Sequence, residues 1–260
     1  MNTTKTSRIW KRRFCRISGG KKYMSKADKY QELFTDAFLM GPNSVRLLAE
    51  MLEKCPIDEG LRILDLGCGK GLTSLFLAKE TKAQVYAVDL WVSATENYEQ
   101  FKKWDVDKSV IPLHSDANDL PFANEFFDVV VTIDSFHYFA AQPRFFEQKI
   151  LPLLEPKGVA IIVMPGLKEE IHGKEPEVIL EWLDGEESEY HLFHSRDWWL
   201  KHIGQSDDFK VLMDFDLKSF DEAWQDWFSS RHEFALRDEE FFKKGIGKYL
   251  STVGLVIQKV

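Results

Sequence analysis

Apolar and polar residues follow two patterns along the chain, one with helical spacing and one typical of buried strands. Residues 44–55 place apolar side chains on one helical stripe, at Val45, Leu48, Met51, Leu52 and Cys55. Strand-like apolar runs follow at 61–66, 84–90, 110–115, 127–135 and 158–164. The last two runs are apolar at successive positions, which is typical of strands covered on both faces. This βαβα order predicts a doubly wound α/β fold around a parallel sheet.

The segments between these runs carry helix and turn signals. Residues 72–80 continue with helical spacing directly after the first run. Ser93 and Glu96 have the spacing of a capping box, so we expect a helix from there to about Trp104. A helix over 143–154 would connect the fourth and fifth strands.

The pattern changes in the C-terminal half. Residues 167–190 are acidic and contain turn signals, whereas 194–203 and 219–245 have helical spacing with many aromatic side chains. Further strands are predicted over 209–217 and 249–260. These two strands bring the predicted total to seven.

Three glycines interrupt the pattern between the first strand and the next helix, at Gly67, Gly69 and Gly71. A glycine turn at a helix N-terminus lets a ligand approach the backbone and points free N–H groups at it, so a nucleotide-like cofactor is expected. Leu72 occupies the last glycine position of both a Walker loop and the dinucleotide fingerprint G-x-G-x-x-G. The loop therefore departs from both of these motifs.

Five features in order resemble class I S-adenosylmethionine-dependent methyltransferases. They are ILDLGCGKG at 63–71, the acid Asp89 that closes VYAVDL, Asp116-Ala117 after the third strand, FDVVVTIDSFHYF at 127–139 and LLEPKG at 153–158. The resemblance covers about residues 44–164. It implies a Rossmann-like seven-stranded sheet with helices on both faces, an antiparallel last strand and an aromatic-rich C-terminal insertion.

The same resemblance implies how the chain is divided. We expect one methyltransferase domain over 25–260, with its core at 44–164, cap insertions at about 166–245 and the last strand at about 249–259. S-adenosylmethionine is the implied cofactor, and S-adenosylhomocysteine is the implied product.

Roles for individual residues also follow from the resemblance. Asp65 and the backbone of 67–71 would border the methionine part of the cofactor, and Asp89 would accept both ribose hydroxyls. Asp116 would take the adenine amino group, and the Ala117 N–H would donate to a ring nitrogen. The full set of expected cofactor contacts is Asp65, Gly67, Cys68, Gly69, Asp89, Leu90, Trp91, Asp116, Ala117 and Asp134.

Each of these residues also has a structural interpretation. Asp65 and Asp89 could cap turns, and Asp116 stands in SDAND, which is a good turn sequence. Cys68 is expected to fill the loop rather than to act in redox chemistry. The role of Asp134 is expected to be that of a hydrogen-bond acceptor that anchors its loop, rather than that of a base.

The end of the fourth strand is the candidate acceptor side, because ligands bind beyond the carboxyl ends of parallel strands. His137 and Tyr138 are the candidate catalytic residues, and His137 could act as a base with a pKa near the working pH. The alternative is that both residues line the pocket and take no proton.

Two segments outside the core could contribute to the pocket. Residues 30–43 could form a lid through Tyr30, Phe34, Phe38 and Met40, or an ordinary packing helix. The C-terminal aromatics could select a substrate, for example a cationic amine. Alternatively, they could pack in the hydrophobic core. These aromatics are Trp182, Tyr190, Phe193, Trp198, Trp199, Trp224, Trp227 and Phe228. No metal is expected, because His172, His191 and His194 lack a recognisable site spacing.

Charge and cysteine usage limit the partners and the location. The chain of 260 residues has a net charge of -8, but residues 1–24 contain eight Lys or Arg and no acid. The rest carries 26 basic and 42 acidic side chains, which argues against a nucleic-acid partner. The basic leader is expected to be a disordered extension, or to lie upstream of a true start at Met24; an RNA-binding arm and an organelle transit peptide are alternatives.

We expect no membrane partner, because no apolar run approaches the roughly 18 residues of a membrane helix. Three cysteines without CxxC spacing favour a cytoplasmic location. The protein would be a monomer or homodimer. The resemblance implies that it methylates a small molecule by in-line displacement, as enzymes of the ubiquinone-biosynthesis type do. Carbon atoms of lipids are an alternative methyl acceptor. A non-catalytic S-adenosylmethionine sensor and an NAD-dependent oxidoreductase remain alternatives.

Overall fold

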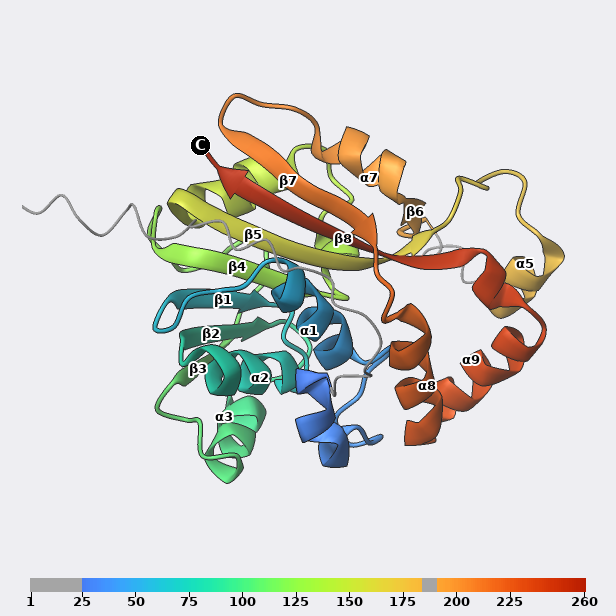
Figure 1. Ribbon diagram of the computed structural model, residues 1–260, viewed down its shortest axis with the longest axis horizontal. Coiled ribbons are helices and arrows are strands. Elements are labelled where there is room, and N and C mark those ends of the chain that lie inside the picture. The colour runs from blue at the N-terminus through green and yellow to red at the C-terminus, as the bar shows by residue number, and fades with distance from the viewer. Residues whose placement is uncertain (1–24, 184–190) are drawn as a thin grey trace, which may run out of the picture.

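One mixed sheet forms the centre of the computed structural model, which describes residues 25–183 and 191–260. Its strands follow the order β3-β2-β1-β4-β5-β8-β7 (Figure 1). They are β1 (Arg62–Leu66), β2 (Gln84–Asp89), β3 (Val110–His114), β4 (Phe127–Ile133), β5 (Leu154–Leu167), β7 (Phe209–Asp216) and β8 (Leu250–Lys259). The first five pair in parallel, whereas β8 is antiparallel to both of its neighbours.

The predicted fold class is therefore confirmed, including the antiparallel last strand. The sheet has one strand more than the seven expected. The addition is β6 (His194–Ser195), which pairs in parallel with the end of β5 at Gly166 and Leu167. Two residues are too few to give a periodic sequence signal, so this strand could not be anticipated.

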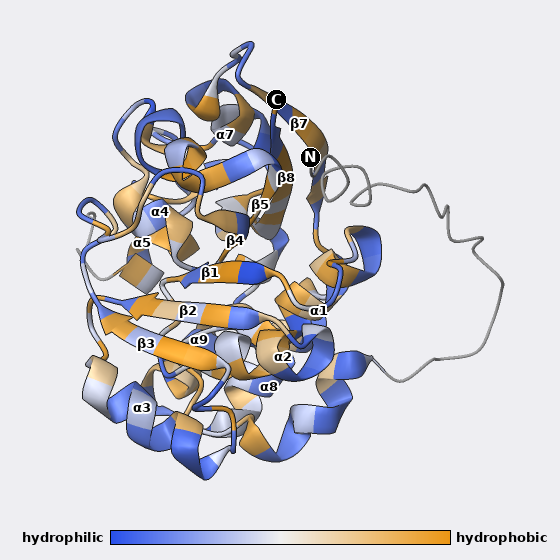
Figure 2. Cartoon of the chain, turned by 90° about the vertical axis from the view of Figure 1, so that its left-hand side faces the viewer, coloured by the Kyte–Doolittle hydropathy of each residue, from blue (hydrophilic) through white to orange (hydrophobic). Residues whose placement is uncertain are grey.

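Alternate residues of the central strands belong to two separate hydrophobic clusters. Ile63 and Val129 pack with helices on one face, whereas Leu64 and Val130 pack with helices on the other. This alternation is the reason that the strands are apolar at successive positions. Figure 2 shows β1, β2 and β3 as largely hydrophobic strands beside the hydrophilic surface of α3.

The helices of the core begin and end close to their predicted positions. They are α1 (Ser44–Lys54), α2 (Leu72–Thr81) and α3 (Ala94–Lys103), and the predicted capping box of Ser93 and Glu96 is present. After β4 comes the short α4 (Phe136–Phe139). The helix expected over 143–154 is instead a π-helical turn at Phe146–Ile150 and a 3-10 turn at Leu151–Leu153, because Pro152 cannot donate a helical hydrogen bond.

The C-terminal half adds α5 (Glu177–Leu183), α7 (Arg196–Ile203), α8 (Phe220–Ser230) and α9 (Glu233–Lys243). Helix α5 lies in the acidic region for which only turns were expected. A 3-10 helix (Lys26–Leu33) precedes the core, and another, Ile246–Lys248, precedes β8. Helices α5, α8 and α9 lie beyond the carboxyl ends of the parallel strands, on the right in Figure 1.

Two predictions concern residues outside the described part of the chain. The basic leader, residues 1–24, is one of them, and Tyr190 belongs to the other undescribed segment, residues 184–190. Within the described ranges, no helix is both long enough and apolar enough to span a membrane.

Candidate functional site

A cavity of about 520 Å³ lies at the carboxyl ends of the first four strands. Its lining residues come from five segments, within 38–44, 66–73, 88–91, 115–118 and 133–142. The volume is in the usual range for pockets that enclose a cofactor. Ligands of open α/β sheets bind at this edge, so the fold places a cavity where the sequence predicted one.

The glycine turn between β1 and α2 forms the floor of this cavity. Gly67, Gly69 and Gly71 all have left-handed backbone angles, with φ of 75°, 53° and 82°. A Cβ at Gly67 would collide with Ser135, and one at Gly71 would collide with the Phe101 ring. The left-handed backbone and neighbouring protein atoms therefore already require glycine at Gly67 and Gly71.

The first three N–H groups of the turn have acceptors within the protein. Those of Gly67 and Cys68 donate to the Val88 carbonyl, and that of Gly69 donates to Asp89. The sequence had suggested free N–H groups aimed at a ligand, and at these positions this was wrong. Leu72 and Thr73 also line the cavity and begin α2, and the first N–H groups of a helix have no partner within it, so donors for a ligand remain there.

Asp65 lies behind the turn and does not line the cavity. The side chain is 1% exposed, and its carboxylate accepts hydrogen bonds from Thr73 Oγ1 at 2.7 Å and Ser74 Oγ at 2.5 Å. Burial raises its pKa to about 6, although these two hydroxyls oppose the shift. Asp65 therefore ties the end of β1 to the first turn of α2.

Asp89 ends β2 and lines the cavity. Its Oδ2 accepts the Gly69 N–H, and its Oδ1 accepts the N–H groups of Trp91 and Val92, each at 2.8 Å. These bonds fix the carboxylate at the junction of two loops. A carboxylate oxygen can accept more than one hydrogen bond, so the group retains capacity for ligand hydroxyls.

The remaining expected contacts on this side of the site also line the cavity. Asp116 and Ala117 follow β3, with Asp116 Oδ1 held by the backbone and side-chain nitrogens of Asn118. These bonds lower the pKa of Asp116. Leu90 and Trp91 are exposed at the opening, where the Trp91 ring meets the Tyr138 ring edge to face at 5.0 Å.

Cys68 lines the cavity as expected, but its thiol is poorly suited to redox chemistry. The residue is 6% exposed, and burial raises the pKa of the thiol well above its usual value. A reactive cysteine requires the opposite shift. Cys68 therefore fills space beside Asn97, whose Nδ2 lies 3.6 Å from the sulfur.

The segment before α1 covers the cavity only in part. Phe38 and Met40 line it, as the lid hypothesis requires. Tyr30 packs instead on Phe76 with its hydroxyl on Glu80, and Phe34 is buried beneath Arg46. The predicted lid thus divides into a packed part and a part that faces the cavity.

Arg46 anchors this segment from the other side. It forms an ion pair with Asp28 at 2.8 Å and another with Asp226 of α8. Asn43 caps α1 and also donates to Asp226, at 2.7 Å. The cavity-facing residues 38–42 are therefore held close to an anchored helix start.

Asp134 follows β4 and lines the cavity with a left-handed backbone, at φ 57°. Among the described residues, its carboxylate has no hydrogen-bond partner, so the expected loop-anchoring role was wrong. Burial raises its pKa from 3.8 to about 7. Asp134 also lines a second, small cavity with Phe193 and Trp224, so it stands between the main cavity and the C-terminal aromatics.

The two candidate catalytic residues differ in position. Tyr138 lines the cavity and is 43% exposed. His137 is 2% exposed, does not line the cavity, and has a buried Nδ1 without a hydrogen-bond partner. Burial lowers the pKa of His137 to about 3, and not to the near-neutral value that a base would need. This position does not support the predicted role of His137 as a base.

Residues 64–162 match the protein-family model described as a methyltransferase domain. The chain therefore contains a methyltransferase domain. Its resemblance to the class I S-adenosylmethionine-dependent methyltransferases is confirmed, and S-adenosylmethionine is the cofactor that this domain implies.

Curated relatives match parts of this chain. Human mitochondrial arginine-hydroxylase NDUFAF5 is 35% identical over 103 residues, which are 40% of this chain and 28% of that protein. The cypemycin N-terminal methyltransferase of a Streptomyces species is 33% identical over 148 residues, 55% of each chain. The chain thus spans about a quarter of the first relative and about half of the second.

Solved structures share the fold at low identity. Phosphoethanolamine N-methyltransferase 2 from Haemonchus contortus, in complex with S-adenosyl-L-methionine, superposes with a TM-score of 0.68 and 19% identity. The match covers 91% of this chain and 57% of that one. At this identity the likeness supports the fold alone.

Most of the C-terminal aromatics pack rather than line the main cavity. The Nε1 groups of Trp182 and Trp227 both donate to Asp238, each at 2.8 Å. Trp199 is fully buried. Phe193 and Trp224 are exceptions, because they line the small cavity beside Asp134.

Sequence reasoning missed part of the cavity wall. Ser135, Phe139 and Gln142 all line it from the segment after β4. Ser135 Oγ donates to the Leu66 carbonyl at 2.9 Å, which joins the ends of β4 and β1. Their place just beyond a parallel strand was the available signal, but none has a chemistry that marks it.

Proposed function

We propose that this protein transfers a methyl group from S-adenosylmethionine to a small-molecule acceptor. The observation that carries the proposal is the single cavity in which the glycine turn, Asp89 and the Asp116-Ala117 pair meet at the carboxyl edge of the sheet. These groups suit a ligand that has a ribose and an adenine. When bound, the cofactor supplies a methyl group that is already activated by a sulfonium.

In this proposal, one side of the cavity holds the cofactor. Asp89 accepts hydrogen bonds from the ribose hydroxyls, for which its fixed carboxylate is suited. Asp116 accepts a hydrogen bond from the adenine amino group, and the Ala117 N–H donates one to a ring nitrogen. Leu90 and Trp91 cover the face of the adenine. Gly67, Cys68 and Gly69 border the amino-acid tail.

The acceptor side lies at the end of β4. Asp134 is the proposed proton acceptor, because its pKa of about 7 lets it take a proton from an amine or hydroxyl near neutral pH. Tyr138 and the cavity-facing Phe38 and Met40 would hold the acceptor in line and exclude water. His137 would support α4 from behind, without contact with the reacting atoms.

Two considerations favour a small acceptor. The body of the chain is acidic, which disfavours RNA or DNA, and the cavity is open enough for a metabolite-sized molecule beside the cofactor.

The proposal also includes a cytoplasmic location and a monomer or homodimer. Because one relative bears the name of a mitochondrial protein, cell fractionation with a mitochondrial marker is the direct test of location.

Hydroxylation of a guanidino compound is the second candidate, favoured by the 35% identity to the arginine-hydroxylase. Mass spectrometry separates the two reactions, since methylation adds a CH₂ unit and hydroxylation adds an oxygen atom. Panels of amines, hydroxyl compounds, thiols, lipids and guanidino compounds should be incubated with the protein and S-adenosylmethionine. For hydroxylation, the guanidino compounds should also be incubated with O₂ as the oxygen source and an added two-electron reductant, so that the second oxygen atom leaves as water. Formation of S-adenosylhomocysteine with a methylated product supports the first proposal.

The cofactor itself is tested first by calorimetric titration with S-adenosylmethionine, S-adenosylhomocysteine and NADH. We expect micromolar binding of the first two and none of NADH. Binding of NADH alone would overturn the proposal and favour the oxidoreductase alternative. Binding of S-adenosylmethionine without turnover of any acceptor would favour the sensor alternative.

A further inference from the structure

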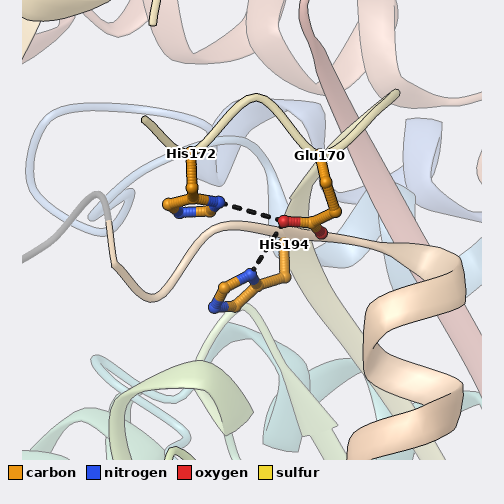
Figure 3. Close-up of side chains that lie close together, drawn as sticks. All are labelled: Glu170, His172 and His194. Carbon is orange, nitrogen blue, oxygen red and sulfur yellow. Dashed lines mark hydrogen bonds and ion pairs between the residues drawn. The ribbon is translucent and has the colours of Figure 1, made fainter. Parts of the chain in front are cut away.

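Glu170, His172 and His194 converge beyond the end of β5, outside the cavity described above (Figure 3). One carboxylate oxygen, Oε2 of Glu170, lies 3.0 Å from His172 Nδ1 and 3.2 Å from His194 Nδ1. All three potential ligand atoms lie within 4.8 Å of one another. We propose that this cluster binds one divalent transition-metal ion, with Zn²⁺ as the best-suited ion.

The distances are close to those that a metal requires. Ligands about 2.1 Å from a tetrahedral Zn²⁺ lie about 3.4 Å from each other. The two Glu170-to-histidine distances are already near this value, and the distance between the two histidine nitrogens is at most 4.8 Å, so shifts of about an ångström would admit the ion. Two imidazoles and a carboxylate also form a donor set that favours Zn²⁺ and its first-row neighbours over Mg²⁺ and Ca²⁺.

The surroundings hold two of the three ligands in place. The second oxygen of Glu170, Oε1, accepts the backbone N–H of Ser195. The His194 ring stacks on the Trp198 ring at 3.5 Å with an interplanar angle of 6°. His194 is also fixed by strand pairing, because it lies opposite Gly166 in the β5–β6 register. Contacts of this kind orient metal ligands before the ion binds.

The chain topology explains why the sequence did not reveal this site. Glu170 and His172 follow β5, whereas His194 begins β6, 22 residues beyond His172. The short β5–β6 pairing brings the two segments together. An ion here would fasten both ends of the insertion that contains α5, and it would leave at least one coordination position open to water or another ligand.

The competing explanation is a hydrogen-bonded cluster in which both imidazoles donate to Glu170. Glu170→Gln separates the two explanations. Its amide oxygen can still accept from Ser195, and its amide nitrogen can pair with the histidines in their other tautomer. The variant therefore keeps a hydrogen-bonded cluster but loses the anionic ligand.

The test uses the full chain, purified without a polyhistidine tag and stripped of metal by a chelator. Zn²⁺ is titrated calorimetrically, and Co²⁺ is added as a spectroscopic probe of the coordination. We expect one Zn²⁺ per chain with micromolar or tighter affinity, and visible Co²⁺ absorption that Zn²⁺ abolishes. Glu170→Gln, His172→Ala and His194→Ala should each weaken Zn²⁺ binding roughly tenfold or more.

His232→Asn is the matched control, because it removes a histidine at the start of α9 while asparagine retains the helix cap. It should leave Zn²⁺ affinity unchanged. Absence of saturable Zn²⁺ binding, or equal binding by wild type and Glu170→Gln, would overturn the proposal. Titration of the same samples with S-adenosylmethionine checks that each variant is folded, and it keeps this result separate from the proposed methyl transfer.

Discussion

Asp89 connects three backbone N–H groups of two loops while it faces the cavity, so its substitution has two effects. Asparagine would keep one acceptor oxygen for the loops and remove the charge offered to the ribose. We expect Asp89→Asn to weaken S-adenosylmethionine binding about 10- to 100-fold, the cost of one or two charge-assisted hydrogen bonds. Calorimetry measures this directly. Asp119→Asn is the control, since Asp119 is exposed and outside the cavity; equal affinities in the two variants would remove Asp89 from the ribose site.

Asp134 should make activity depend on pH near neutrality. With its pKa near 7, the carboxylate is protonated below that pH and can accept a proton above it. We expect kcat/KM for a protonated acceptor to rise through about pH 7 to a plateau. Asp134→Asn should lower the plateau by about a hundredfold, typical of a lost general base. An unchanged pH profile in the variant would exclude Asp134 as the proton acceptor.

The raised pKa of Asp134 also makes the free energy of unfolding depend on pH. Between about pH 4 and 7 the folded protein retains a proton on Asp134 that the unfolded chain has released. The free energy of unfolding therefore falls as the pH rises across this window. Asp134→Asn removes the effect and should stabilise the protein by about 2 kcal/mol at pH 8, after allowance for partial exposure. Urea unfolding at pH 4.5 and 8 provides the measurement.

His137 should show the opposite behaviour in acid. Its folded pKa of about 3 lies below the ordinary value of 6.5, so the unfolded chain takes up a proton first as the pH falls. Stability is thus complete above pH 6.5 and is lost progressively below it, by about 2 kcal/mol at pH 5. His137→Phe should remove this loss and retain methyl transfer. If turnover instead disappears while cofactor affinity remains, His137 has the catalytic role that the sequence suggested.

At the scale of elements, the turn between β1 and α2 depends on space as well as on backbone angle. Gly67 and Gly60 have nearly equal φ values, 75° and 78°, but only at Gly67 would a Cβ strike another residue, Ser135. We expect Gly60→Ala to cost about 1 kcal/mol for its left-handed backbone, and Gly67→Ala to cost about 2 to 4 kcal/mol because the collision is added. Urea midpoints give both values. Equal losses would mean that Ser135 moves aside at little cost.

Elements whose signals are local could be predicted from the sequence. The strand β4 and the capped helix α3 were placed to within a residue or two, because continuous apolar runs and a capping box are short-range features. The two-residue β6 and the helix α5 were not predicted. The first exists through its pairing with β5, and the second lies in an acidic segment with a weak periodic pattern.

Site residues could be predicted from the sequence where they lie at, or just beyond, the end of a parallel strand. Asp89 reaches the cavity because it ends a parallel strand, and Asp116 and Tyr138 reach it because they lie beyond one. Burial could not be read from residue type, so Asp65 and His137 were placed in contact with ligands although both lie behind the cavity wall. The cluster of Glu170 and His194 was missed for a related reason, since long-range pairing brings it together.

At the scale of the whole molecule, the cavity joins five segments that are far apart in the sequence, from Phe38 to Gln142. A cofactor that touches all of them binds the folded state and not the unfolded chain. At one hundred times its dissociation constant it should stabilise the fold by about 2.7 kcal/mol, which raises the melting temperature by several degrees for a chain of this length. We expect this shift with S-adenosylmethionine and S-adenosylhomocysteine but not with NADH, and in Asp89→Asn only at correspondingly higher ligand concentrations. Thermal scans over a ligand series measure it, and hydrogen exchange should show added protection at residues 38–42. A shift without protection there would mean that this segment does not close on the cofactor.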